Sequence, residues 1–148
     1  MNIYRPAREF CLQFFFHTQI PIFKELGTNY ADNTELEETL GLYKETTNTL
    51  LDSKLNKFAS ELISNTIKNS EKIEDTIVKN LTNWKIDRLS KVDKTILMMS
   101  CAEILYHDTK ANIVINEAVE LGKKFGSQDS ASFINGVLDK IAKTYEKL

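Results

Sequence analysis

The chain has 148 residues and a formal charge of −2, and its residues are 42% hydrophobic and 27% charged. These values are typical of a folded globular domain and argue against a largely disordered chain. A chain of this length can remove roughly 68–70% of its unfolded surface from water, so a substantial core is expected. The small negative charge excludes nucleic-acid binding through a globally basic surface and leaves only local basic patches for that role.

The start of the sequence lacks the pattern of a cleavable leader, and no apolar run is long enough for a membrane-spanning helix. Arg5 and Arg8 instead lead directly into a segment rich in aromatic residues. We therefore expect a cytoplasmic protein that makes no membrane contact.

Residues 5–18 are expected to form the first helix. The segment FCLQFFF at residues 10–16 is apolar except for Gln13, so this helix would be apolar on every side. Such a helix must be covered on more than one face, either by its own fold or by a partner. We expect a central core helix and leave open a role in association, through an aromatic side chain that stays outside.

The next three helices are expected to carry single apolar stripes. Thr34 and Glu37 suggest a capping box at the start of the second helix. The third helix has apolar residues at four- and three-residue steps and should stop near Asn69. Ser70 then opens the fourth helix. We place a soft boundary between two subdomains near residues 69–71.

The second half is expected to be organised around a helix and a hairpin. Residues 92–106 form an almost entirely apolar fifth helix, which should lie at the centre of this half. Two amphipathic helices then form a hairpin over residues 115–142. Gly126 suits the left-handed residue that ends the first arm, and Asp129 or Ser130 suits the N-cap of the second arm.

The fold class follows from these periodicities. No segment alternates apolar and polar residues for long enough to indicate a strand. The chain is predicted to be all-α, with about seven helices in two small helical-bundle subdomains that form one compact domain over residues 1–148.

The sequence contains no recognisable pattern of catalytic or metal-binding residues. A glycine-rich phosphate loop, a nucleophile elbow and a His-Glu-x-x-His zinc motif are all absent from it. Cys11 and Cys101 lie in apolar helical stretches and are expected to be buried free thiols. His17 and His107 are isolated from other metal ligands. We therefore expect no enzymatic activity, no cofactor and no metal site.

Two groups of residues suggest contact with a nucleic acid. Arg5 and Arg8 are three residues apart on one face of the first helix, where guanidinium groups can bind phosphates. For this pair alone, two solvated charges at a helix start are the simpler explanation. Phe125 and Phe133 flank a polar turn, and proteins that bind single-stranded RNA combine aromatic rings with nearby cations.

Three blocks of the sequence resemble the NusB family of bacterial transcription antitermination factors. They are Arg5-Pro-Ala-Arg8-Glu with the following aromatics; Asn83-Trp84, Asp87-Arg88-Leu89 and Val92-Asp93-Lys94; and Ile115-Asn116-Glu117-Ala118-Val119-Glu120-Leu121 with Phe125-Gly126, Asp129-Ser130, Phe133 and Asn135-Gly136-Val137-Leu138-Asp139. The third block is the most specific, and together the blocks cover almost the whole chain.

The resemblance implies a helical, non-enzymatic protein that binds boxA-type single-stranded RNA of ribosomal RNA leaders. It also implies a partner, the ribosomal protein NusE, and a role in linking the RNA to the RNA polymerase antitermination complex. Tyr4 and Pro6 stand at positions that are often basic in the family. We therefore expect weak RNA binding by the chain alone and tighter binding with NusE.

The resemblance also implies site residues, position by position. The implied RNA contacts are Arg5, Arg8, Phe125, Asp129 and Phe133, and the implied NusE contacts are Phe16 and Asp93. Asp129 keeps two interpretations, as a helix cap and as an RNA contact. The competing hypothesis is a helical interaction module that self-associates, for example as a homodimer, and binds RNA only weakly.

Overall fold

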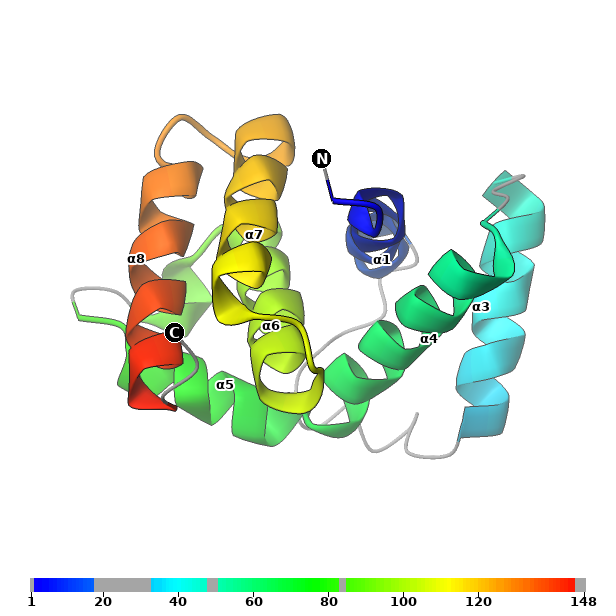
Figure 1. Ribbon diagram of the computed structural model, residues 1–148, viewed down its shortest axis with the longest axis horizontal. Helices are drawn as coiled ribbons and strands as arrows, with labels where there is room; N and C mark the ends of the chain where they lie inside the picture. The colour runs from blue at the N-terminus through cyan, green and yellow to red at the C-terminus, as the bar shows by residue number, and fades with distance from the viewer. Residues whose placement is uncertain (1, 18–32, 48–50, 83–84, 146–148) are drawn as a thin grey trace.

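The computed structural model describes residues 2–17, 33–47, 51–82 and 85–145, without the side chains of residues 33–36 and 46. This part of the chain contains seven α-helices and no strand, which confirms the all-α prediction (Figure 1). The helices are α1 (Arg5–His17), α3 (Asn33–Thr47), α4 (Ser53–Lys68), α5 (Ser70–Lys79), α6 (Lys91–Tyr106), α7 (Ala111–Phe125) and α8 (Ser130–Thr144), with a short 3-10 helix η2 (Ile86–Arg88) before α6.

Helix α1 is a core helix that leaves one aromatic ring outside. Phe10, Phe14 and Phe15 are buried, and the rings of Phe10 and Phe14 both lie 5.4 Å from the ring of Tyr43 in α3. Phe16, in contrast, is 36% exposed. The structure thus confirms a central helix, and Phe16 is the side chain that stays available for association.

Helix α6 is the centre of the fold. Ser90 caps its start by accepting a hydrogen bond from the Asp93 N–H at 3.1 Å. Every residue from 94 to 104 is buried, because α6 packs against α1, α4, α5, α7 and α8. The prediction of a wrapped, nearly all-apolar helix is confirmed.

The break between α4 and α5 falls at Asn69, where it was expected. Helix α4 begins after Asp52, whose carboxylate accepts the Leu55 N–H at 2.8 Å. Buried apolar residues on both sides of the break belong to one core cluster, so the division into two subdomains stays a prediction. The predicted capping box depends on the Thr34 side chain, which lies outside the described residues, as does Trp84.

Helices α7 and α8 pack side by side as the predicted hairpin (Figure 1). Ile115 and Ala118 of α7 and Ile134 and Leu138 of α8 are all buried, and the two helices contact each other along their length. A Cβ atom added at Gly122 would lie 3.1 Å from Ile134 Cδ1, which shows how closely the two helices approach. The hairpin is therefore held by its apolar stripes and by a small residue at its narrowest point.

The turn between α7 and α8 differs from the prediction in one respect. Gly126 has φ −98° and ψ −166°, so it is extended, and the predicted left-handed conformation is wrong. Glycine is needed here for space, because an added Cβ would lie 2.4 Å from Ser130 Oγ and 2.7 Å from the Gly122 carbonyl oxygen. The turn is tight because Ser130 folds back onto it.

Both cysteines are buried free thiols, as predicted. Burial raises the pKa of Cys101 to about 12 and raises the pKa of Cys11 further. Burial also lowers the pKa of His107, whose Nε2 lies 3.1 Å from the Asn65 amide nitrogen. Thiols and imidazole in these states are neutral near pH 7 and serve as packing groups.

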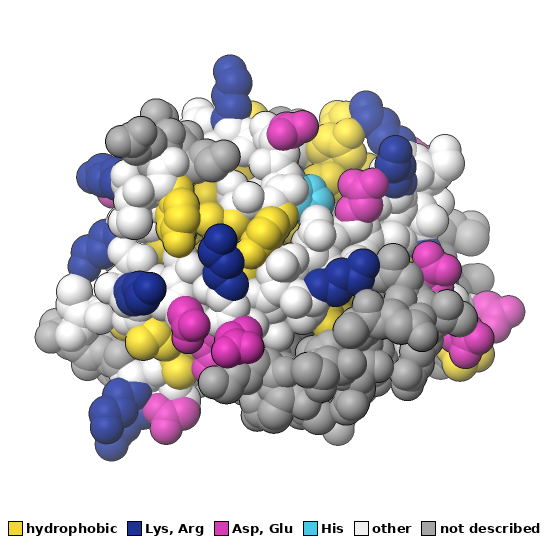
Figure 2. Space-filling model, turned by 90° about the horizontal axis from the view of Figure 1, so that it is seen from below, with side chains coloured by type: hydrophobic (Ala, Val, Ile, Leu, Met, Phe, Trp, Pro, Cys, Tyr) yellow, Lys and Arg dark blue, Asp and Glu magenta, His cyan; other side chains and the backbone are white. Residues whose placement is uncertain are grey.

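The surface mixes apolar and charged side chains. On the described part of the face in Figure 2, hydrophobic side chains form small groups separated by Lys, Arg, Asp and Glu. Ile3, Leu42 and Val78 are among the exposed large hydrophobics. No helix in the described residues has the length and apolar character needed to cross a bilayer.

Replacing Gly126 by Ala should lower the free energy of unfolding by about 1–3 kcal/mol, the usual cost of overpacking. Gly136 is the matched control, since a Cβ there meets nothing within 4 Å. It lies inside α8, so Gly136→Ala should raise the free energy of unfolding by about 0.5–1 kcal/mol. Urea unfolding measures both values, and two variants of equal stability would contradict the steric role of Gly126.

Candidate nucleic-acid interface

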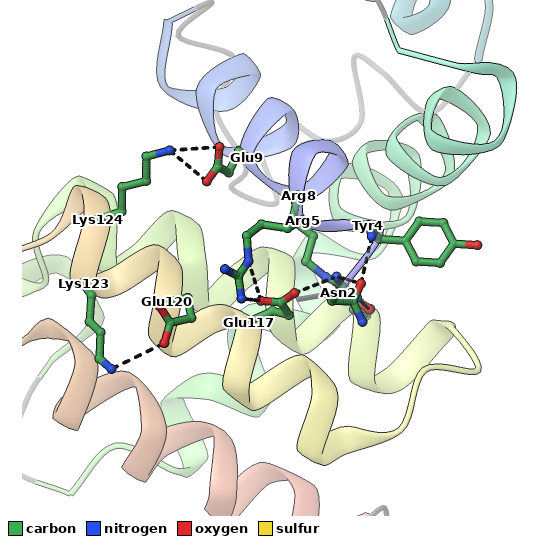
Figure 3. Close-up of polar contacts among 10 residues, drawn as sticks. Asn2, Tyr4, Arg5, Arg8, Glu9, Glu117, Glu120, Lys123 and Lys124 are labelled. Atoms are coloured by element: carbon green, nitrogen blue, oxygen red, sulfur yellow. Dashed lines mark hydrogen bonds and ion pairs between the residues drawn. The ribbon is translucent and has the colours of Figure 1, made fainter.

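The start of α1 is fastened to α7 by Arg5. Its Nε and Nη2 atoms donate to Glu117 Oε2 at 3.0 and 2.7 Å (Figure 3). The Arg5 side chain is 33% exposed, whereas the Glu117 side chain is 5% exposed. Glu117 raises the pKa of Arg5, mainly through these hydrogen bonds. The guanidinium therefore lies at the surface with a defined orientation, and a phosphate would reach it from solvent.

Arg8 occupies a different environment from Arg5. It is 3% exposed, and its Nε and Nη2 atoms donate to the two oxygens of buried Glu103 in α6 at 2.8 and 2.5 Å. Its Nη1 donates to Asn2 Oδ1 at 3.0 Å and lies 3.9 Å from Glu117 Oε1. The expectation of two guanidinium groups facing phosphate is therefore revised, because in this structure the Arg8 guanidinium is enclosed by protein.

A charged cleft of about 210 Å³ runs between α1 and α7. Four basic and three acidic side chains line it, which leaves a net charge of +1; they are Arg5, Arg8, Lys123 and Lys124, with Glu9, Glu117 and Glu120. A phosphate entering the cleft would meet cations that already have carboxylate partners. The cleft can thus bind an anion, but its own acidic residues compete with that anion.

Lys124 lines the cleft and lies in the last turn of α7, so positively charged side chains continue from the cleft towards the α7–α8 turn. Its Nζ lies 3.0 Å from Glu9 Oε1 and 5.3 Å from the centre of the Phe125 ring. Lys123 pairs with Glu120 at 3.4 Å and is 61% exposed (Figure 3). The sequence predictions assign no role to Lys123 and Lys124, and basic residues in the last turn of a helix already have an explanation in the helix dipole.

Asp129 lies in the turn as an exposed carboxylate. It is the N-cap residue of α8 by position, but its side chain makes no capping hydrogen bond. The Ser127 N–H donates instead to Ser130 Oγ at 2.9 Å, and the Ser130 N–H donates to the Ser127 carbonyl oxygen at 3.1 Å. Of the two interpretations of Asp129, side-chain capping is therefore excluded here.

A groove of about 460 Å³ lies between this turn and the start of α6. Its lining includes Asp129 and Phe133 from the hairpin, and Arg88 and Asp93 from η2 and α6. The Phe133 ring packs partly on the core and also borders a second groove of about 210 Å³. Sequence reasoning assigned Asp93 to a separate surface, whereas the structure places it in the same groove as Asp129 and Phe133.

Phe16 lies near the start of α6. The Nζ atom of Lys91, the first residue of α6, lies 4.8 Å from the centre of the Phe16 ring. Asp93 follows two residues later, and its Oδ1 atom is buried with no hydrogen-bond partner among the described residues. Phe16 thus lies near the first residue of α6, and Asp93 in the same helical turn lines the groove that contains Phe133.

These features define the class of the protein. It is an all-helical protein over its described residues, with cations and aromatic rings along α1, the end of α7 and the α7–α8 turn. Among the described residues, no group of three or more His, Cys, Asp or Glu could hold a metal ion.

Comparison with known sequences identifies the family. The model described as "NusB family" matches residues 5–143. The transcription antitermination protein NusB of Geobacter sp. (strain M21) is 37% identical over an alignment of 147 positions that covers 97% of this chain and 97% of the relative. The protein of the same name from Thermodesulfovibrio yellowstonii is 39% identical over 140 residues, covering 94% of this chain and 91% of the relative. The chain therefore belongs to the NusB family.

Solved structures agree with this assignment. The chain superposes on T. maritima NusB with a TM-score of 0.75 at 29% identity, covering 96% of this chain and 92% of the other. A chain in a structure described as "Crystal Structure of a Plectonemic RNA Supercoil" gives a TM-score of 0.77 at 25% identity, with 99% and 98% coverage. Antitermination factors of the NusB family are not enzymes, in agreement with the prediction from the sequence.

Replacing Arg8 by Met should lower the free energy of unfolding by about 3–5 kcal/mol, because Glu103 would remain buried without its partner. The double variant Arg8→Met, Glu103→Met removes both charges and should recover most of that loss. Arg5→Met is the matched control at the surface, and its loss should be smaller. Urea unfolding measures all three, and an Arg8→Met protein as stable as the parent would contradict a structural role for Arg8.

Proposed function

We propose that this chain is an RNA-binding transcription antitermination factor that recognises boxA-type single-stranded RNA together with the ribosomal protein NusE. It would link the RNA to the RNA polymerase antitermination complex in the cytoplasm. The observation that carries the proposal is the family match over residues 5–143. The cations that line the cleft between α1 and α7 and the Phe133 ring that lines the groove beside the α7–α8 turn support it.

The proposed RNA path follows α7 from Arg5 to the hairpin turn. Glu117, which holds Arg5, and Lys124 are seven residues apart on α7, about 10 Å along the helix axis. Phe125 comes next, beneath the Lys124 ammonium group, and Asp129 and Phe133 line the groove beyond it. Phosphates would bind the cations, and unpaired bases would stack on the rings.

Arg8 has an indirect role in this proposal. Its contacts with Glu103 in α6 and its closeness to Glu117 in α7 hold the start of α1 against both helices. Arg5 is one turn away and takes its orientation from the same Glu117. We therefore assign phosphate contact to Arg5, Lys123 and Lys124, and we assign to Arg8 the positioning of Arg5.

NusE would bind beside the start of α6, where Phe16 and Asp93 lie. Phe16 is 36% exposed and offers an apolar contact, and Asp93 contributes a carboxylate to the lining of the adjoining groove. The same turn of α6 borders the groove that contains Phe133. A protein bound there would complete one wall of the RNA site, which explains why RNA and NusE should bind cooperatively.

A titration of labelled boxA RNA tests the proposed function. The protein alone should bind weakly, with a salt slope of roughly −2 for two or three phosphate contacts. Adding NusE should lower the Kd for boxA and leave a scrambled RNA weakly bound. Equal binding of boxA and scrambled RNA, with and without NusE, would contradict the proposal. The competing module would instead show a dimer mass in solution and no gain from NusE.

Phe133→Ala should weaken boxA binding by about fivefold or more, since stacking contributes about 1–3 kcal/mol per base. Its neighbour Ser132 lines the same groove, so Ser132→Ala is the matched control and should retain most of the affinity. Thermal unfolding accompanies the titration because the Phe133 ring packs partly on the core. Normal boxA affinity in a folded Phe133→Ala protein would remove this ring from the RNA site.

A further inference from the structure

Where α1 meets α4, two aromatic rings and two cations form a column. Its members are Tyr4, Phe58, Lys54 and Arg8. The rings of Tyr4 and Phe58 are stacked, with centres 4.5 Å apart and planes 26° apart. The Nζ atom of Lys54 lies 5.5 Å from the centre of the Tyr4 ring, and Cζ of Arg8 lies 5.1 Å from the centre of the Phe58 ring. Two stacked rings thus have a cation close to each of them.

The column leads from the core to solvent. Phe58 in α4 packs against the core, Tyr4 is half-buried, and Lys54 in the first turn of α4 is exposed. The Tyr4 side chain extends away from Lys123 and Lys124 (Figure 3). The neighbouring Ile3 is 60% exposed. Tyr4 is therefore the outer ring, and a ligand would approach it from the side on which Lys54 lies.

The position of Tyr4 is fixed by the same contacts that fix Arg8. The Tyr4 N–H donates to Asn2 Oδ1 at 2.9 Å, and this oxygen also accepts from Arg8 Nη1 at 3.0 Å. Arg8 lies against Phe58 and pairs with Glu103. A preorganised aromatic surface costs little further ordering when a ligand stacks on it.

The column is continuous with the proposed RNA path. Tyr4 immediately precedes Arg5, whose guanidinium faces the charged cleft, so phosphate-binding and stacking groups lie on adjacent residues. Single-stranded RNA is bound by surfaces of this composition, with cations on the backbone and aromatic rings on the bases. An RNA chain that reaches Arg5 can therefore extend towards Tyr4.

We propose that Tyr4, Phe58 and Lys54 form a second stacking site for a base that flanks the boxA segment, an inference that rests on the proposed function. The flanking base stacks on Tyr4, with Phe58 supporting the ring from behind. Lys54 moves aside to bind the adjacent phosphate. The site selects for unpaired RNA next to boxA and not for a particular base, because every base has a stacking face.

The test compares boxA RNA with the same RNA extended at either end by a few unpaired nucleotides, one of which is the fluorescent base 2-aminopurine. One extended RNA should bind the protein–NusE complex about fivefold or more tightly than boxA alone, and its fluorescence should be quenched by stacking. Tyr4→Phe keeps the ring and should keep both effects. Tyr4→Leu should lose both and bind unextended boxA as the parent does.

Lys54→Gln provides a second variant that leaves the rings in place. It should reduce the gain from the extension, whereas Lys57→Gln, at an exposed position on the same helix, should not. Normal boxA binding with no gain or quenching from either extension would overturn the stacking site and leave the proposed function intact. A full gain in both Tyr4→Leu and Lys54→Gln would also overturn it. Failure of boxA itself to bind contradicts the proposed function instead.

Discussion

The buried ion pair between Arg8 and Glu103 is the interaction on which the arrangement of the surface depends. A charge enclosed in a protein must be paired and hydrogen-bonded, and here both guanidinium edges meet protein acceptors. The pair joins α1 to α6, and Glu117 of α7 lies within 3.9 Å of the same guanidinium. These contacts hold the start of α1 against two helices, and Arg5 meets the same Glu117 of α7.

The same constraint limits how strongly this surface attracts RNA. Glu117 is required to hold α1, so Arg5 cannot be a fully unpaired cation, and the cleft keeps a net charge of +1. A cleft whose charges are nearly balanced can orient a phosphate, but its electrostatic contribution to the binding free energy is small. In the proposed function, affinity would then come from stacking on aromatic rings and from a protein partner. This physical reason supports joint binding of RNA and NusE.

Local sequence patterns were enough to predict the helices, since apolar periodicity and capping residues act over a few positions. They predicted the central position of α6, the hairpin and the exposure of one aromatic residue on α1. They were not enough to separate Arg5 from Arg8. Those arginines share a helix face, and their acceptors Glu117 and Glu103 lie 112 and 95 residues away in the sequence.

In the α7–α8 turn, too, the local sequence predicts some features, whereas others depend on tertiary contacts. A glycine after α7 was correctly predicted to end the helix, but its extended conformation is set by contact with Ser130. The sequence leaves Asp129 with two interpretations, and the structure shows no capping hydrogen bond to its side chain, because Ser130 accepts the Ser127 N–H instead. The common groove of Asp93 and Phe133 depends on how η2 and α6 meet the hairpin, which no local pattern encodes.

Chemical-shift mapping of the ¹⁵N-labelled protein with boxA RNA and NusE tests the proposed RNA surface most directly. We expect the largest RNA-dependent changes at the start of α1, at the end of α7 and in the α7–α8 turn, including Arg5, Lys124 and Phe133. The exposed face of α5 around Val78 should remain unchanged. RNA-dependent changes centred on that face, with none at Arg5 or Phe133, would contradict the proposed site.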